Sequence, residues 1–190
     1  MKKFYLYILM LMPVFALTSC EDAEIASTLE GTWKGNMYIS TEHGGEIYDA
    51  TYTEITFEID PFYFSKGSGY WVDYYDTKRY PRLSRPYVAN HIDWEVNNRT
   101  IYIHFLEEGT SLRISDYRLS NNRFRGTLYD GNRIVEFDFD HTYSPNWNDY
   151  SYWGYDHWLY NFFTRGEGEG ASDSTAVTPL EKPRRFIREK

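Results

Sequence analysis

Acidic side chains recur at every second position in several short segments, a spacing that could pair carboxylates for hydrolytic chemistry. Residues two apart on an extended strand share a face at about 7 Å, which suits a reaction using one carboxylic acid and one carboxylate. The same segments alternate with apolar residues, so we expect these carboxylates to face solvent and predict no catalytic residues. The sets are Asp93/Glu95 and Glu136/Asp138/Asp140, together with Glu54/Glu58, which are four positions apart on the same face.

The sequence offers no clear pattern for metal or nucleotide chemistry. Its five histidines lack the paired spacing that is typical of a metal site. Asp138, Asp140 and His141 could gather a cation, but charged residues at the end of a strand are commoner. A Gly-x-Ser-x-Gly elbow, a phosphate loop and a dinucleotide fingerprint are all absent from the sequence. We therefore predict a protein that is not an enzyme and has no cofactor and no metal site.

An aromatic segment near the C-terminus is the best candidate for a binding surface. Residues 143–163 hold ten aromatic side chains among asparagines and aspartates. Flat rings with polar neighbours suit the face of a sugar or a protein partner. The same rings could instead cap one end of a β-domain, and we favour that interpretation. The candidate binding residues are Trp147, Trp153, Tyr155 and Trp158.

The first 20 residues resemble the signal peptide of a bacterial lipoprotein. A short positive start precedes 14 almost entirely apolar residues. This run is too short to span a bilayer as a helix, which takes about 20 residues, but it is typical of a signal-peptide core. The following Leu-Thr-Ser-Cys, which ends at Cys20, is similar to a lipobox. We predict that residues 1–19 are removed and that acyl chains on Cys20 hold the protein to a membrane.

Composition limits which partners, metal sites and fold classes are possible. Cys20 is the only cysteine, so the chain has no internal disulfide and no thiolate metal site. The formal net charge is −8, and it is −10 without the first 19 residues, whose only charges are two lysines. An acidic chain repels phosphate backbones, so we expect no nucleic-acid partner. Aromatic residues make up 19% of the sequence, and their abundance favours an all-β domain.

Short runs of alternating apolar and polar residues predict this β-domain over residues 29–165. Tyr70, Val72 and Tyr74 share a face in one run, and Asn97-Asn98 turns another run into the next. Asparagine-rich links between such runs are strong hairpin signals. Eight strands are predicted, over residues 32–39, 51–60, 69–76, 91–96, 100–106, 111–119, 123–130 and 133–140.

Eight strands with one apolar face and no long helix to cover it favour a small closed antiparallel barrel, with a two-sheet sandwich as the alternative. Leu112 and Ile114 are out of phase with Tyr117 and Leu119, which predicts a bulge near residues 115–116. The many large rings should fill the barrel rather than line a ligand cup. The residues expected inside include Trp33, Phe57, Ile59, Tyr70, Trp94, Phe105, Phe124, Phe137 and Phe139.

The segments outside this domain carry fewer signals. We interpret residues 20–28 as an acidic tether and residues 76–90 as a basic loop. A short helix is expected within the aromatic segment. Beyond residue 165 the composition turns to Gly, Glu, Ser, Thr and Pro, so residues 166–190 are predicted to be disordered. Ser174 lies there in a tripeptide that resembles an O-glycosylation motif of Bacteroidota.

Two motifs of three residues lie at the start of the first predicted strand and within the sixth. Gly31-Thr32-Trp33 is similar to the lipocalin Gly-x-Trp motif, and Ser115-Asp116-Tyr117 is similar to the Thr-Asp-Tyr motif. With the eight strands, they make the chain resemble the lipocalin-like lipoproteins that are common in Bacteroidota. The resemblance implies a barrel in which Trp33 packs across the closed end under an arginine, and it implies no particular ligand. Arg125, Arg133 and Arg165 are the candidates for that arginine.

Together these observations predict a non-enzymatic lipoprotein of the outer membrane, a binding or structural module of the cell envelope. Two alternatives are a carrier of a small apolar ligand in the barrel and a carbohydrate-binding surface protein that uses the aromatic segment. The expected partners are the membrane and a glycan or another protein. Glu21, Asp22 and Glu24 resemble an acidic signal for surface display, or form a solvated linker; the side of the membrane stays open.

Overall fold

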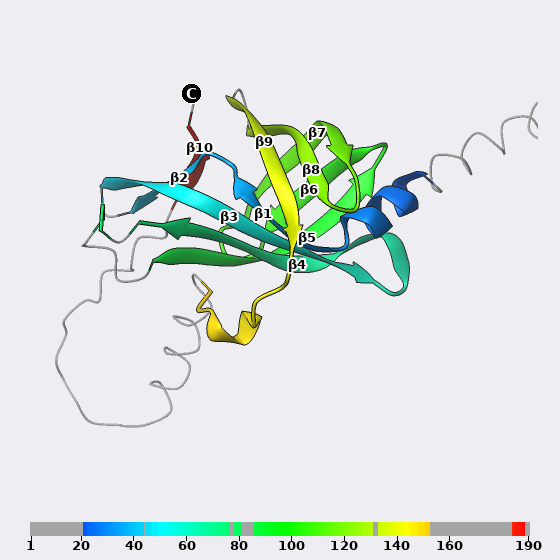
Figure 1. Cartoon of the computed structure of the whole chain (residues 1–190), viewed down its shortest axis with the longest axis horizontal. Coiled ribbons are helices and arrows are strands. Elements are labelled where there is room, and N and C mark those ends of the chain that lie inside the picture. Colours follow the sequence, from blue (N-terminus) through cyan, green and yellow to red (C-terminus); the bar gives the residue numbers. More distant parts are fainter. Residues whose placement is uncertain are drawn as a thin grey trace, which may run out of the picture.

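Most strands of the protein form a closed antiparallel barrel (Figure 1). The computed structural model describes residues 21–43, 45–76, 78–80, 86–130, 133–152 and 184–188. Eight strands, β1 and β3 to β9, follow one another around the barrel, and the pairing of β1 with β3 closes it. The predicted eight-stranded barrel is thus confirmed. The strands are β1 (Gly31–Asn36), β2 (Ile39–His43), β3 (Glu46–Asp60), β4 (Tyr63–Tyr75), β5 (Tyr87–Asn97), β6 (Thr100–Phe105), β7 (Thr110–Leu119), β8 (Arg123–Asp130), β9 (Arg133–Thr142) and β10 (Arg184–Ile187).

Large rings fill the barrel. Phe57 meets Trp94 edge-on, with ring centroids 5.4 Å apart, and Phe124 meets Phe137 at 4.9 Å. All four side chains are buried. The interior of an eight-stranded barrel is just wide enough for side chains to fill, so this packing leaves the described barrel with a protein core rather than a deep cup.

Two irregularities bend the strands. The predicted strand 32–39 divides into β1 and β2 because Tyr38 has a φ of 51° and the Asn36 side chain accepts a hydrogen bond from the Tyr38 amide. This bend carries β2 away from the barrel. In β7 the pairing register shifts between Ser115 and Arg118, and Asp116 has a φ of 52°. The bulge predicted near residues 115–116 is confirmed.

Strand β4 faces the opposite way from the prediction. Tyr70, Val72 and Tyr74 lie on the outer face of the barrel, where they pack with residues of β5 and the segment that follows β9. Trp71 and Asp73 point inward instead, and both are fully buried. The prediction failed because β4 is covered on both sides, so its apolar alternation does not say which face is the core.

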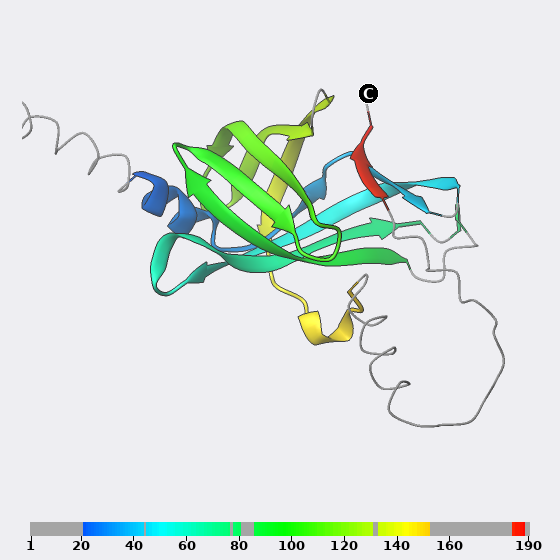
Figure 2. The ribbon, with the colours of Figure 1, turned by 180° about the vertical axis from the view of Figure 1, so that it is seen from behind.

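Residues 21–29, which include most of the predicted acidic tether, are helical, and they cover one end of the barrel (Figures 1 and 2). Ala26 and Leu29 are fully buried. The Asp22 carboxylate accepts hydrogen bonds from the amides of Asn98 and Arg99, in the turn between β5 and β6. None of the helices in the described part of the chain is long and apolar enough to span a bilayer.

The tail predicted to be disordered contributes a strand. Residues 184–187 form β10, which pairs with β2 in antiparallel register. Figures 1 and 2 place β10 at the end of the barrel opposite the helix. The sequence does hold a weak signal for this strand, since Phe186 and Ile187 are the first adjacent large apolar residues after residue 163.

Candidate functional site

A buried ionic cluster lies at the end of the barrel that β10 covers. The Nε atom of Arg185 lies 2.7 Å from Oδ2 of Asp73, and Nη1 of Arg185 lies 2.9 Å from Oε1 of Glu108. The exposed fractions of the three side chains are 5% for Arg185, 0% for Asp73 and 5% for Glu108. One guanidinium is therefore enclosed with two carboxylates, away from water.

Two elements bring Arg185 to this place. Strand β2 pairs with β3 on one edge and with β10 on the other, so that Arg185 stands opposite Thr41. Ile187, two residues further along β10, is buried in the barrel core. Because alternate residues of a strand share a face, β10 directs a cation and an apolar side chain into the same end of the barrel.

Barrel residues hold the carboxylate of Asp73 in position. Its Oδ1 atom accepts hydrogen bonds from Oγ1 of Thr53 at 2.6 Å and from Nε1 of Trp71 at 3.0 Å. This leaves Oδ2 for the arginine. Aromatic faces complete the walls, since the guanidinium carbon of Arg185 lies 4.3 Å from the ring centre of Phe105 and 5.6 Å from that of Trp71. Such cation–π contacts are strengthened when they are desolvated.

Asn90 and Glu108 form the other side of the site. Nδ2 of Asn90 donates to Oε1 of Glu108 at 2.9 Å. Burial raises the pKa of Glu108, and the nearby Asp73 charge raises it further, whereas Arg185 lowers it. Within the described residues, Oδ1 of Asn90 and Nη2 of Arg185 are buried without a hydrogen-bond partner. Nη1 of Arg185 lies close to Glu108, but it makes no hydrogen bond. The site thus has unused hydrogen-bonding capacity.

None of the residues of this cluster was proposed from the sequence. The alternation in the predicted strand 69–76 puts Asp73 on the face opposite Tyr70, which is the solvent side in that prediction, and Arg185 lies in the tail that is predicted to be disordered. Asp73 and Trp71 share a face of the predicted strand 69–76. The prediction takes the other face as the interior, so it gives no sign of a buried carboxylate beside an indole.

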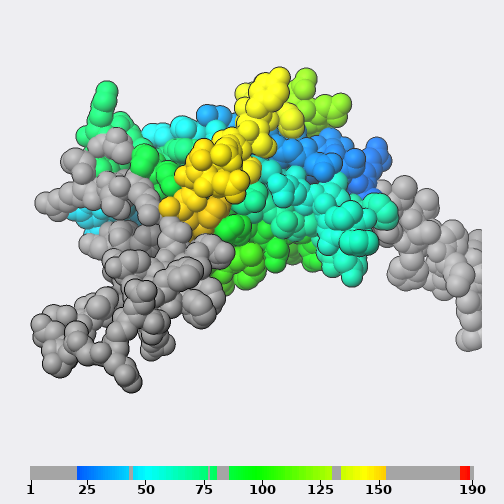
Figure 3. Space-filling view, turned by 90° about the horizontal axis from the view of Figure 1, so that it is seen from below, coloured from blue at the N-terminus to red at the C-terminus, as the bar shows by residue number. Residues whose placement is uncertain are grey.

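The aromatic segment covers the side of the barrel rather than its end. Trp147, in a short 3-10 helix (Trp147–Asp149), stacks on Tyr70 with centroids 4.9 Å apart and planes at 13°. Tyr152 is buried against the same surface. Figure 3 shows residues 143–152 lying across the barrel surface. Of the predicted binding residues, the structure therefore places Trp147 in a packing role. Cys20, Trp153, Tyr155, Trp158 and Ser174 lie outside the described residues.

The predicted carboxylate sets are not assembled into one site. Glu54 is buried rather than solvated: it pairs with Nζ of Lys34 at 3.0 Å and accepts a hydrogen bond from Tyr74. Asp138 pairs with Arg123 and Arg125. Those arginines hold the pKa of Asp138 below its usual range. In the part of the chain that the structure describes, no group of three or more His, Cys, Asp or Glu side chains is arranged to hold a metal ion.

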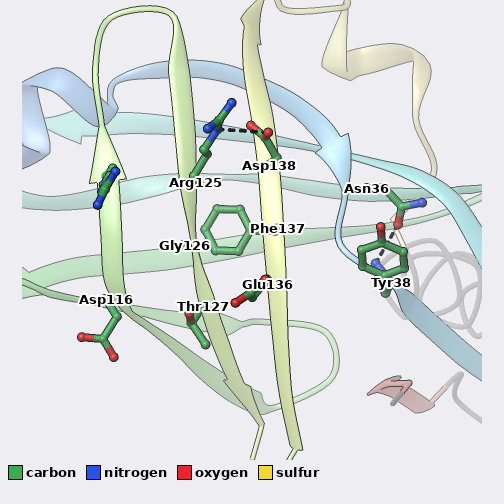
Figure 4. Close-up of a pocket in the computed structure, with 10 residues that line it drawn as sticks. Asn36, Tyr38, Asp116, Arg125, Gly126, Thr127, Glu136, Phe137 and Asp138 are labelled. Atoms are coloured by element: carbon green, nitrogen blue, oxygen red, sulfur yellow. Dashed lines mark hydrogen bonds and ion pairs between the residues drawn. The ribbon is translucent and has the colours of Figure 1, made fainter. Parts of the chain in front are cut away.

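A hollow of about 490 Å³ lies between β1 and strands β7 to β9. Figure 4 shows Arg125 and Asp138 joined across β8 and β9 at its edge. Its charged groups are exposed, and two of them, Arg125 and Asp138, bind each other, so the hollow offers a ligand less than the enclosed cluster does.

The environment of Trp33 agrees only in part with the lipocalin pattern. Its indole Nε1 donates to the carbonyl of Leu29 at 2.7 Å, below the helix that covers the barrel end. Two rings meet it edge-on, that of His141 at 4.9 Å and that of Phe124 at 5.8 Å. Among the arginines proposed for this contact, Arg125 instead pairs with Asp138 at the surface.

Comparison with known proteins identifies the domain. The model of a family described as a lipocalin-like domain matches residues 29–126, which include β1 to β7 and the first half of β8. No curated protein matches the chain. Among solved structures, a redesigned beta barrel has 11% sequence identity and a TM-score of 0.36, with 63% of this chain and 95% of that chain covered. On the strength of the family match, this chain belongs to the lipocalin-like domain family.

Proposed function

We propose that this protein is a non-enzymatic lipoprotein of the bacterial outer membrane, a binding module that rests on the bilayer with the helix-covered end of its barrel. The lipobox-like sequence supports the anchor, because Cys20 directly precedes the helical residues 21–29. Acyl chains on Cys20 would hold this end of the barrel within a few residues of the lipid.

The observation that carries this proposal is the exposed aromatic tip of the β3–β4 hairpin. The exposed fractions are 84% for Phe62, 55% for Tyr63 and 73% for Phe64. Figures 1 and 2 show this hairpin beside the N-terminal helix. Aromatic rings gather at membrane–water interfaces, where they bury their apolar parts. A lipid surface at this end would cover rings that water would otherwise surround.

The filled barrel supports a binding module that uses its ends and edges rather than a deep apolar cup. Phe57, Trp94 and Phe105 are buried where the cup of a carrier would lie. The opposite end, with Asp73, Glu108 and Arg185, would face away from the bilayer and would remain accessible to partners.

Labelling with palmitate tests the anchor directly. Wild-type cells should incorporate labelled palmitate into the protein, and the Cys20→Ala variant should incorporate none and should accumulate with its first 19 residues attached. Ser19→Ala, which keeps a small residue before the cysteine, is the matched control and should be labelled normally. Labelling of the Cys20→Ala variant to the wild-type level would overturn the anchored function.

A further inference from the structure

Strand β10 occupies a site that the rest of the barrel already forms. Asp73, Asn90 and Phe105 belong to β4, β5 and β6, and Glu108 lies in the turn between β6 and β7. Each of these residues is placed by barrel strands and not by β10. The receiving site is therefore built by one part of the chain and filled by another.

The geometry of the site suits a guanidinium group in particular. Carboxylates approach two different nitrogens of Arg185, Nε from Asp73 and Nη1 from Glu108. The ring of Phe105 lies 4.3 Å from the guanidinium carbon. A planar, delocalised cation can hydrogen-bond one carboxylate, pair with a second at another nitrogen and present its face to a ring, whereas a compact ammonium cannot satisfy all three in the same way.

A strand is the natural carrier of that group. Pairing with the edge of β2 sets the position of the backbone, with residue 185 opposite Thr41 and residue 187 opposite Ile39. Addition of a strand to a sheet edge provides affinity through the main chain and specificity through pockets for alternate side chains. Here the pockets accept arginine and, two positions later, a large aliphatic residue.

The attachment of β10 to the barrel also permits exchange. The strand has only four residues, and 31 residues separate it from Tyr152. As a part of the same chain, β10 competes for the site at a finite effective concentration. An external strand with the same side chains can therefore displace it.

We propose that this end of the barrel is a binding site for an extended peptide of another protein, which carries arginine and, two residues later, an aliphatic side chain. Strand β10 occupies the site in its absence. The peptide adds to the edge of β2, its guanidinium binds Asp73 and Glu108, and its aliphatic side chain takes the place of Ile187. The site does not depend on the lipid anchor, so the two proposals can fail separately.

The test uses the purified full-length protein and a fluorescent peptide with the sequence of residues 183–190. Fluorescence anisotropy should show that the Arg185→Ala protein binds this peptide at least about tenfold more tightly than wild type does, because its own strand competes less well. The peptide with Arg185→Lys should bind at least about tenfold more weakly than the unchanged peptide. An Arg118→Ala protein, altered at an exposed arginine, is the matched control and should behave as wild type.

A second variant allows the same test if the first variant does not fold. If Arg185→Ala protein does not fold, Ile187→Ala protein weakens β10 without leaving charges unpaired and should show the same gain in peptide affinity. Two outcomes would overturn the proposal. One is a folded variant that fails to bind the peptide or does not distinguish arginine from lysine. The other is a stable wild-type dimer that Arg185→Ala converts to a monomer, which would assign the site to exchange of β10 between copies.

Discussion

The Nε atom of Arg185 lies 2.7 Å from Oδ2 of Asp73, although 112 positions separate the two residues in the sequence. The pair links the strand nearest the C-terminus to the interior of the barrel. Because Asp73 is fully buried, its charge relies on this arginine and on its hydrogen bonds rather than on water. Removal of one partner should therefore be far more damaging than the loss of a surface ion pair.

Replacement of Arg185 by alanine tests this dependence. The variant should lose about 3–5 kcal/mol of stability, the usual cost of leaving a buried charge unpaired, as measured by urea unfolding of the full-length protein. Arg118→Ala should change the unfolding free energy by no more than about 0.5 kcal/mol. A loss below about 1 kcal/mol for Arg185→Ala, within the range of an exposed pair, would mean that the cluster is open to solvent.

Stability should also respond to pH through Glu108. Burial and the charge of Asp73 raise the pKa of Glu108 above its ordinary value of 4.5, against the opposing effect of Arg185, while Tyr75, Asn90 and Thr110 complete its surroundings. A carboxyl group whose pKa is raised on folding binds its proton more tightly in the folded state. Its unfavourable contribution is therefore absent below the unfolded pKa and grows as the pH rises through the folded pKa.

The Glu108→Gln variant isolates this contribution. Its thermal midpoint relative to that of wild type should improve as the pH rises above 4.5, the ordinary pKa of the carboxyl group. Glutamine carries no charge to bury and can still accept a hydrogen bond from Asn90. Thermal unfolding of both proteins across this range gives the difference. A difference that stays constant, or that favours wild type more strongly at higher pH, would contradict the raised pKa.

The barrel interior should behave as a close-packed core. Trp94 and Phe137 are 3% and 4% exposed, and truncation of such rings usually costs about 3–5 kcal/mol because a cavity remains. Trp94→Ala and Phe137→Ala should each reach this range in urea unfolding. Exposed Tyr102→Ala on β6 is the comparison and should cost little. Losses below about 1 kcal/mol at both buried sites, well under the core penalty, would favour the ligand carrier.

The sequence predicts the barrel well because most of its strands bury only one face. Ile101 and Ile103 are buried while Tyr102 and His104 are exposed, so alternation alone identifies both the strand and its orientation. Strand β4 breaks this relationship because the segment around Trp147 covers its outer face. Periodicity cannot distinguish two buried faces.

The ionic cluster lay beyond sequence reasoning for a different reason. Arg185 stands in a segment whose polar composition is typical of disorder, and its partner is a single aspartate on a strand of ambiguous orientation. Nothing local in either segment indicates the other. Only the pairing of β10 with β2 brings them together, and that pairing depends on four residues whose pattern is too short to predict a strand.

The aromatic hairpin makes the orientation on the membrane measurable. Phe62 lies in the turn between β3 and β4, Phe64 is the second residue of β4, and both side chains are exposed. That turn lies at the end of the barrel where residues 21–29 begin. If acyl chains on Cys20 hold this end at the bilayer, these rings should lie in the interface, where apolar side chains are buried and polarity falls.

A single labelled position can report this depth because Cys20, the only cysteine, is blocked when it is acylated. A Phe62→Cys protein is labelled with a polarity-sensitive dye and reconstituted in phospholipid vesicles. The reference is the same labelled protein in detergent-free solution after its anchor has been released. The dye emission on vesicles should be blue-shifted relative to this reference. Ile134→Cys places the dye at an exposed position of β9 beside the β8–β9 hairpin. Strands alternate in direction around the barrel, so this hairpin lies at the opposite end, and its dye should show no shift. Equal emission from both positions on vesicles would contradict the orientation while leaving the lipid anchor intact.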